Sequence, residues 1–283
     1  MNAGELARPM VLGIAVLGAM YAFQTRPFRV YPSLEPQDNV PLPSDYQEKT
    51  EWIFGRLMYP QHPQARFGRY ARGYGRVLDW REGGTSWTQD YPRGDRHFAQ
   101  ILRRLTRLHV RSVEQPVNLE WDDDIYNYPF VFAGEMGDWL LTPQQAAKLR
   151  DFLDRGGFLM IDDFWGTEEW DRFMESMRLV FPDKTAVEID ASDAVLRTVY
   201  EIKEQYQIPG QWGLRRGTTY RNDGSVPHFR AIYDDKGRAM VVITFNHDVG
   251  DSWEWADDPR YPEKYSALGF RIGINTVIYS MTH

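Results

Sequence analysis

The chain of 283 residues contains no cysteine. Without cysteine there are no disulfides, no thiolate metal sites, no iron–sulfur clusters, no covalently attached haem and no cysteine nucleophile. The absence does not fix the cellular compartment, because a domain of this size can hold its core together without disulfides.

Basic charge and long hydrophobic runs are also scarce. The formal net charge of −7 argues against a nucleic-acid partner, which would require a basic face. A mean hydropathy of −0.55, with a single long apolar stretch, excludes a polytopic membrane protein. Aromatic residues make up 14% of the chain and exclude disorder for most of it. These values predict one globular domain with a small addition.

The single apolar stretch lies near the N-terminus, where residues 10–23 carry no charge. Extended to residues 6–25, it reaches about twenty residues, roughly the length that crosses the hydrocarbon core as a helix. Arg8 and Arg26 flank it and can reach the two interfaces. Residues 1–25 are therefore predicted to be an uncleaved single-pass transmembrane anchor. Its candidate membrane-facing side chains are Met10, Leu12, Ile14, Leu17, Tyr21 and Phe23.

A cleaved signal peptide is the alternative for this segment, although no small-x-small cleavage site follows the apolar run. The next segment, residues 26–50, contains five prolines, a spacing that prevents helix and favours an extended, semi-rigid strap. This strap is either a plain tether or a segment that lies along a partner. The side chains that would contact a partner are Phe28, Val30, Tyr31 and Leu34.

Residues 51–283 alternate between strand-like and helix-like segments. Apolar periodicity and capping residues predict helices over 98–108, 142–157, 167–181 and 265–283. Short apolar runs predict buried strands over 128–134, 158–162 and 238–246. Strands that alternate with capped helices predict an α/β domain with a mostly parallel sheet.

Four blocks of this domain, in order, resemble one family. They are YPRGDRHF (91–98), YPFVFAGEMGDWLLTPQQAAKLRDFLDRGGFLMIDDFWG (128–166), FNHDVGDSWEW (245–255) and FRIGINTVIYSMTH (270–283). Over about residues 50–283 the chain resembles the domain-of-unknown-function family 4159. The resemblance implies a flavodoxin-like three-layer sandwich of the class I glutamine amidotransferase-like type, near the ThuA-like branch. It implies no activity, because the family has none assigned.

In the amidotransferase-like fold, the nucleophilic cysteine stands on a tight turn between a strand and a helix. The resemblance places Asp162 and Asp163 on this turn, and His247 near the position of the triad histidine. A carboxylate cannot form the thioester that glutamine hydrolysis requires, so that reaction is excluded. The three side chains are expected to converge at the carboxyl ends of the strands, where open sheets place their ligands.

Three interpretations of these residues stay open. In a hydrolytic site, Asp163 or His247 acts as general base on water. In a metal site, the ligands come from Asp162, Asp163, His247 and His97. In a structural interpretation, which we favour, Asp162 caps the following helix and His247 makes one buried hydrogen bond. No cofactor is predicted.

The segment 91–98 immediately precedes a predicted helix. Asp95 is expected to be its N-cap, which leaves Arg96 and His97 available for interactions. Arg96 would either bind an acidic ligand or, as we favour, pair with the acidic residues at 122–124.

Residues 250–265 combine aromatic and acidic side chains and are predicted to form a surface loop. Trp and Tyr often anchor interfaces, so this loop is a candidate docking patch. Its candidate interaction residues are Trp253 and Trp255, with Asp248 just before it.

These features together favour a non-catalytic, membrane-anchored accessory or structural subunit that stabilises a larger membrane-protein complex. Candidate assemblies include a photosynthetic reaction-centre–antenna complex, a transporter and a secretion machine. The expected partners are the other subunits and, through residues 6–25, the lipid bilayer. The alternatives are a metal-dependent or Asp/His hydrolase of ThuA-like type, and a cell-envelope module that binds carbohydrate or peptide.

The export-type N-termini of related family members imply an inner-membrane protein with its domain in the periplasm. Arg26 and Arg29 follow the apolar stretch on the domain side, and by the positive-inside rule they would place the domain in the cytoplasm. The family resemblance is given the greater weight here, because the charge bias is only about two residues.

Overall fold

A seven-stranded mixed sheet organises the domain in the computed structural model, which describes residues 28–36, 41–65, 79–121, 123–204 and 206–283. The strand order is β2-β1-β3-β4-β7-β6-β5. The five strands from β2 to β7 in this order are parallel, whereas β6 and β5 run antiparallel to their neighbours. The bounds are β1 Gly55–Met58, β2 Gln115–Asn118, β3 Phe130–Ala133, β4 Phe158–Ile161, β5 Val187–Glu188, β6 His228–Tyr233 and β7 Ala239–Phe245. The predicted α/β class with a mostly parallel sheet is confirmed.

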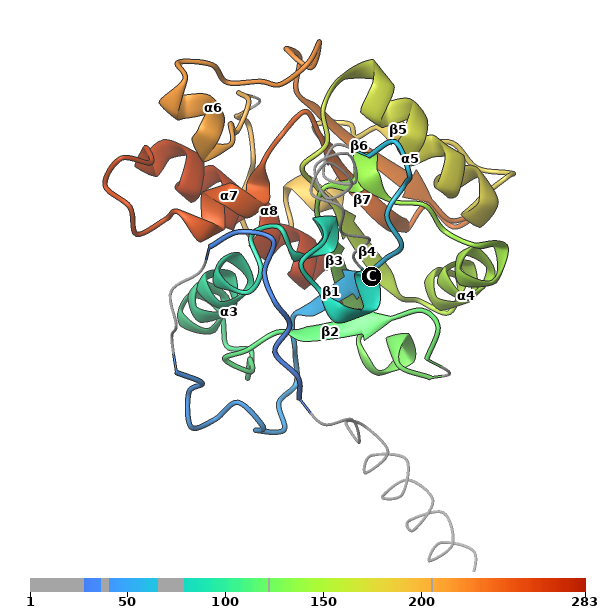
Figure 1. The fold of residues 1–283 in the computed structure, drawn as a ribbon, viewed down its shortest axis with the longest axis horizontal. Helices are drawn as coiled ribbons and strands as arrows, with labels where there is room; N and C mark the ends of the chain where they lie inside the picture. The colour runs from blue at the N-terminus through green and yellow to red at the C-terminus, as the bar shows by residue number, and fades with distance from the viewer. Residues whose placement is uncertain (1–27, 37–40, 66–78, 122, 205) are drawn as a thin grey trace, which may run out of the picture.

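Helices cover both faces of this sheet (Figure 1). On one face, α3 (Arg93–Leu105) packs against α7 (Val249–Glu254) and α8 (Glu263–Thr282). On the other, α4 (Pro143–Asp154) packs against α5 (Gly166–Val180). The short helix α6 spans Gln211–Arg215. Single 3-10 turns lie at Trp80–Glu82, Ser86–Thr88, Ile125–Asn127, Met136–Asp138 and Ala194–Leu196.

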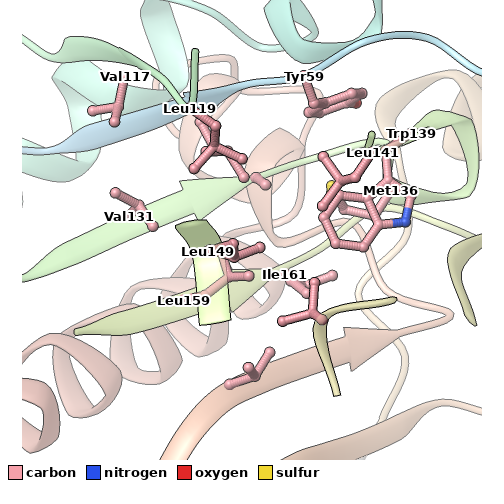
Figure 2. Packing of buried hydrophobic residues seen from close by; sticks show 14 of the residues in the cluster. Tyr59, Val117, Leu119, Val131, Met136, Trp139, Leu141, Leu149, Leu159 and Ile161 are labelled. Atoms are coloured by element: carbon pink, nitrogen blue, oxygen red, sulfur yellow. The ribbon is translucent and has the colours of Figure 1, made fainter. Parts of the chain in front are cut away.

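Each face of the sheet has its own hydrophobic core, which is why the strands read as continuous apolar runs rather than alternating ones. The core under α4 and α5 contains Val131 and Leu159 from the sheet and Leu149 from α4 (Figure 2). The core under α3, α7 and α8 is rich in aromatic rings, with Phe98 stacked on Trp253 at 4.4 Å between ring centroids. Apolar area removed from water on both faces supplies most of the stabilisation.

A helix begins where the sequence predicts it when its capping residues stand next to it in the sequence. Thr142 and Gln145 form a reciprocal capping box at the start of α4, with Pro143 in the first turn. The helix predicted over 98–108 instead begins at Arg93, so Asp95 lies in its first turn and is not the N-cap. Asp95 is fully buried and forms an ion pair with Arg56 of β1, which ties α3 to the sheet.

The prediction of a surface loop over 250–265 is wrong in its first part. Residues Val249–Glu254 form α7, whose N-cap Asp248 accepts a hydrogen bond from the backbone nitrogen of Asp251. Trp253 is 1% exposed, so it is a core residue and not part of a docking patch. Its ring fills the space between α3 and the sheet, against Phe98 and Phe132.

The described parts of the predicted strap, residues 28–36 and 41–50, pack against the domain itself. Tyr31 is 5% exposed, its ring meets Trp87 edge-on at 5.3 Å, and its backbone nitrogen donates to the hydroxyl of Tyr91. Pro32 and Leu34 add backbone hydrogen bonds to the segment around residues 84–88. Tyr31 is therefore not a partner contact, because its own domain covers it.

Among the described residues, no helix is both long and apolar enough to cross a bilayer. The predicted anchor, with Met10, Leu12, Ile14, Leu17, Tyr21 and Phe23, lies outside the described residues.

We predict that Tyr31→Ala lowers the free energy of unfolding of the full-length protein by about 3 kcal/mol, because it removes a buried ring and leaves a cavity beside Trp87. Denaturant titration followed by tryptophan fluorescence measures the loss. Val30→Ala is the matched control, since Val30 is 49% exposed and its truncation should change the free energy little. Equal effects of the two variants would show that the strap does not pack as described.

Candidate functional site

Three neighbouring strands end in turns with unusual backbone conformation. Glu135 after β3, Asp163 after β4 and Asn246 after β7 all have positive φ, at 52°, 53° and 60°. Such left-handed residues other than glycine cost on the order of 1 kcal/mol each and cluster at functional sites. The three turns lie side by side at the carboxyl edge of the sheet, where open α/β sheets bind their ligands.

Asp163 stands on the turn between β4 and α5, and its carboxylate is held by two donors. Its Oδ1 accepts from Nε1 of Trp165 at 2.8 Å and from Nη2 of Arg221 at 2.7 Å. Arg221 also donates through Nη1 to Oε1 of Glu135 at 3.0 Å. One guanidinium therefore bridges the acidic residues that follow two adjacent strands.

Arg221 belongs to a turn between α6 and β6 that closes over the start of α5. Asn222 donates to the carbonyl oxygen of Trp165 at 2.9 Å, and Asp223 accepts from the backbone nitrogen of Thr167 at 2.8 Å. Sequence reasoning missed Arg221, because its partners lie 58 and 86 residues away along the chain. The only local signal is its place in an Asn-Asp-Gly turn.

Asp162 is fully buried beside this turn. Its Oδ2 accepts from the backbone nitrogen of Gly250 at 2.8 Å, so it caps α7 and not the helix that directly follows it. The hydroxyl of Thr244 lies 3.0 Å from the carbonyl oxygen of Ile161 and 2.5 Å from Oδ1 of Asp162. A hydroxyl has one hydrogen to donate, so a protonated Asp162 that donates to Thr244 satisfies both contacts. Burial, with the charge of Asp163 second, raises the pKa of Asp162 to about 8, which agrees with a neutral carboxyl.

His247 is buried in the structural role that we favoured. Its Nδ1 accepts from the backbone nitrogen of Ile208 at 3.2 Å, and its ring packs against Phe229 at 4.6 Å. Burial lowers the pKa of His247 to about 3, so the imidazole is neutral. In the part of the chain that the structure describes, His247 makes no hydrogen bond to Asp162 or Asp163.

The other predicted interaction residues lie apart from this turn or inside the fold. Arg96 pairs with Glu114 at 2.9 Å, because the buried Glu114 faces the start of α3. Of the partners predicted for it at 122–124, residue 122 lies outside the described residues. His97 contacts the carbonyl oxygen of Trp253 through Nδ1 at 3.0 Å. Trp255 is half-buried, and its Nε1 donates to Oδ1 of Asp251 at 3.0 Å.

A pocket of about 420 Å³ opens at this edge of the sheet. Its walls carry more acidic than basic side chains, namely Glu35, Glu135, Asp163, Asp248 and Asp251 against Arg216 and Arg221. Aromatic side chains from three segments line it as well, and these are Trp165, Trp212 and Tyr220. The strap contributes Leu34, Glu35 and Pro36 to the wall, so it forms part of the site.

A larger depression of about 550 Å³ lies at the opposite edge, beside Pro129 and Gly157, which precede β3 and β4. The amino edge of an open parallel sheet is not where such folds bind ligands. The acidic pocket at the carboxyl edge is therefore the candidate site.

The predicted metal ligands Asp162, Asp163, His97 and His247 do not form a metal-binding group among the described residues. The groups whose ligand atoms lie within 4.8 Å of one another consist of carboxylates alone, either Glu35, Asp90 and Glu254 or Asp90, Asp248 and Asp251. Asp248 is the one predicted interaction residue in them. Asp90 was missed because its partners converge only in the folded chain.

We predict that the free energy of unfolding falls as the pH rises from about 4 to about 8, and that Asp162→Asn flattens this fall. The folded state keeps a proton on Asp162 up to a pKa of about 8, whereas the unfolded carboxyl loses it near pH 4, so rising pH favours unfolding. An asparagine can donate to Thr244 and accept from Gly250 without titrating. Melting temperatures measured across this range, with a chelator present, test the slope.

Asp171→Asn, which removes an exposed carboxylate from α5, is the control and should keep the wild-type slope. Parallel slopes for wild type and Asp162→Asn would contradict a neutral Asp162.

None of the curated proteins matches the chain. The model of one family, described as a domain of unknown function (DUF4159), matches residues 76–281, which include α3, the turn after β4 and all of α8 except its last residue. This match covers well over half of the chain, and the protein therefore belongs to the DUF4159 family.

Proposed function

We propose that this protein is a non-catalytic accessory subunit that docks a basic segment of a partner protein in its acidic pocket and is held at a membrane by its N-terminal segment. The observation that carries the proposal is the excess of carboxylates in a pocket whose rim presents exposed aromatic rings. The larger assembly would be a membrane-protein complex, of which a photosynthetic reaction-centre–antenna complex is one example.

The proposed ancestry is the flavodoxin-like, class I amidotransferase-like fold. The parallel strands run in the order β2-β1-β3-β4-β7, which corresponds to the 2-1-3-4-5 order of flavodoxin-like sheets. Asp163 has a left-handed backbone on the strand–turn–helix connection where that fold carries its nucleophile. Both observations support the relationship, and the ThuA-like branch remains part of the proposal.

The contacts of the side chains at the turn after β4 favour a role other than catalysis. A nucleophile or general base requires a free, reactive atom within reach of a proton-transfer partner. Oδ1 of Asp163 instead accepts from both Arg221 and Trp165, and His247 is neutral and buried. The turn therefore serves to position charge and not to attack a substrate.

The rim of the pocket supplies the docking chemistry. Trp212 is 57% exposed and Tyr220 is 45% exposed, and both line the opening. Aromatic faces beside carboxylates attract guanidinium and ammonium groups through cation–π and charge interactions. A Lys- or Arg-containing segment of another subunit fits this combination, because charge complementarity sets both orientation and specificity.

We predict that the full-length protein, extracted from its native membranes in mild detergent, co-purifies with another subunit. The double variant Trp212→Ala/Tyr220→Ala should weaken this association about tenfold or more, because exposed aromatic anchors carry much of an interface's energy. Leu105→Ala is the control, since Leu105 is 56% exposed but lies on α3.

Recovery of a lone monomer from native membranes would contradict the docking proposal. Release of a bound sugar, or turnover of an ester or amide abolished by Asp163→Asn, would instead favour the binding-module or hydrolase alternative.

A second prediction concerns the anchor and the side of the membrane. The full-length protein should stay in the membrane after carbonate washing, and its mature N-terminus should precede residue 19, because residues 6–25 are long enough to span the bilayer. The chain has no cysteine, so Lys236→Cys, on the exposed turn between β6 and β7, gives a single labelling site. A maleimide that cannot cross the inner membrane should label it from the periplasmic side. Release by carbonate contradicts the anchor, and labelling only after lysis contradicts the periplasmic side.

A further inference from the structure

We propose that Asp90, Asp248 and Asp251 bind a hard divalent cation at the inner wall of the pocket. The site shares Asp248 and Asp251 with the pocket, but it does not involve the exposed aromatic rings of the proposed docking rim. The carboxylate oxygens of the three aspartates all lie within 4.8 Å of one another. Asp90 comes from the turn before α3, Asp248 caps α7 and Asp251 lies in the first turn of α7. The site thus joins two helices that are far apart in the sequence.

The carboxylate of Asp90 is the observation that points to a ligand. Asp90 is 1% exposed, and its Oδ2 has no hydrogen-bond partner among the described residues. Its Oδ1 accepts from Nε2 of Gln89 at 3.4 Å, which is a long and therefore weak hydrogen bond. A buried carboxylate oxygen without a donor is costly, so a cation at this point would satisfy it.

The other two carboxylates keep acceptor capacity toward the same point. Asp248 uses Oδ1 to accept from the backbone nitrogen of Asp251, at 2.9 Å. Asp251 accepts from Trp255 at 3.0 Å and from the backbone of Gln211 at 2.6 Å. These donors fix the orientation of both carboxylates, and each oxygen has a second lone pair for a metal.

Charge balance requires a counterion or protons here. Asp248 and Asp251 are 6% and 5% exposed, and in the described part of the chain none of the three aspartates forms an ion pair with Arg or Lys. By contrast, Glu135 and Asp163 share the guanidinium of Arg221. Three buried like charges without a counterion repel one another strongly, and a divalent cation removes that repulsion.

Two glycines let backbone approach these carboxylates. A Cβ on Gly250 would lie 2.1 Å from Oδ2 of Asp90, and a Cβ on Gly210 would lie 2.5 Å from Oδ2 of Asp248. Neither glycine has positive φ, so the close approach and not the backbone conformation is what excludes a side chain. The oxygens are therefore enclosed in a tight cradle.

The donor set selects the class of ion. Carboxylate oxygens alone suit Ca²⁺, Mg²⁺ or Mn²⁺, whereas Zn²⁺ prefers nitrogen and sulfur ligands. Glu35 and Glu254 form an adjoining group that shares Asp90, and Oε2 of Glu35 has no hydrogen-bond partner among the described residues. Through Glu35, an ion at this site would also connect the strap to the domain.

The test uses the full-length protein in detergent, stripped with a chelator and titrated separately with Ca²⁺, Mg²⁺ and Mn²⁺. We expect saturable binding of one ion by calorimetry, and a rise of several degrees in Tm at about a hundredfold excess over Kd. Asp90→Asn should abolish both responses. Asparagine tolerates the left-handed backbone at this position, where φ is 59°, so the variant should fold with an ion-free Tm at or above that of the wild type.

Asp171→Asn, a matched change on the exposed face of α5, should keep the wild-type response to the ion. The docking variant Trp212→Ala/Tyr220→Ala should also keep it, which separates this proposal from the docking function. The absence of heat and of a Tm shift with all three ions, or an unchanged response in a folded Asp90→Asn, would overturn the proposal.

Discussion

The burial of many carboxylates at one edge of the sheet is the constraint on which the rest of the structure depends. Each buried carboxylate raises the free energy of the folded state unless a positive charge, a proton or several donors offset its lost hydration. Arg221 supplies positive charge to Glu135 and Asp163. Asp162 is offset by a proton and by the backbone nitrogen of Gly250.

The same constraint explains why segments that are distant in the sequence meet above the sheet. The turn at 221–223 closes over α5 because its arginine and its two polar side chains find partners there. The strap segment 34–36 forms a wall of the pocket, and burial raises the pKa of Glu35 to about 7. Removal of either segment would expose the acidic edge to water, so both contribute to the site as well as to the fold.

The elements that could be predicted from the sequence are those encoded locally. Helix α4 carries its capping box, Pro143 and a terminal glycine within one short segment, and β4 is a plain apolar run. The turn with Asp162 and Asp163 follows directly from these two elements. Residues Arg221, Asp90 and Glu35 could not be found in this way, because nothing near them in sequence marks the carboxylates that they meet.

Trp253 illustrates the opposite error. Its segment is short, acidic and rich in tryptophan, which is typical of an exposed loop. Asp248 caps the N-terminus of this segment, and Trp253 stacks on Phe98, so the segment forms a buried helix. Tertiary packing outweighed local composition, because burial of the large indole ring of Trp253 in the core removes a substantial apolar area from water.

The absence of cysteine has its clearest structural consequence at the turn after β4, where Asp163 stands. A thiolate there would need an open approach for its substrate and a nearby base. An aspartate in the same left-handed position instead attracts donors, and here Arg221 and Trp165 occupy its oxygen. These two hydrogen bonds fix the orientation of the Asp163 carboxylate in the wall of the acidic pocket. The carboxylate thus contributes charge to the pocket wall, which is the property that the proposed docking of basic groups requires.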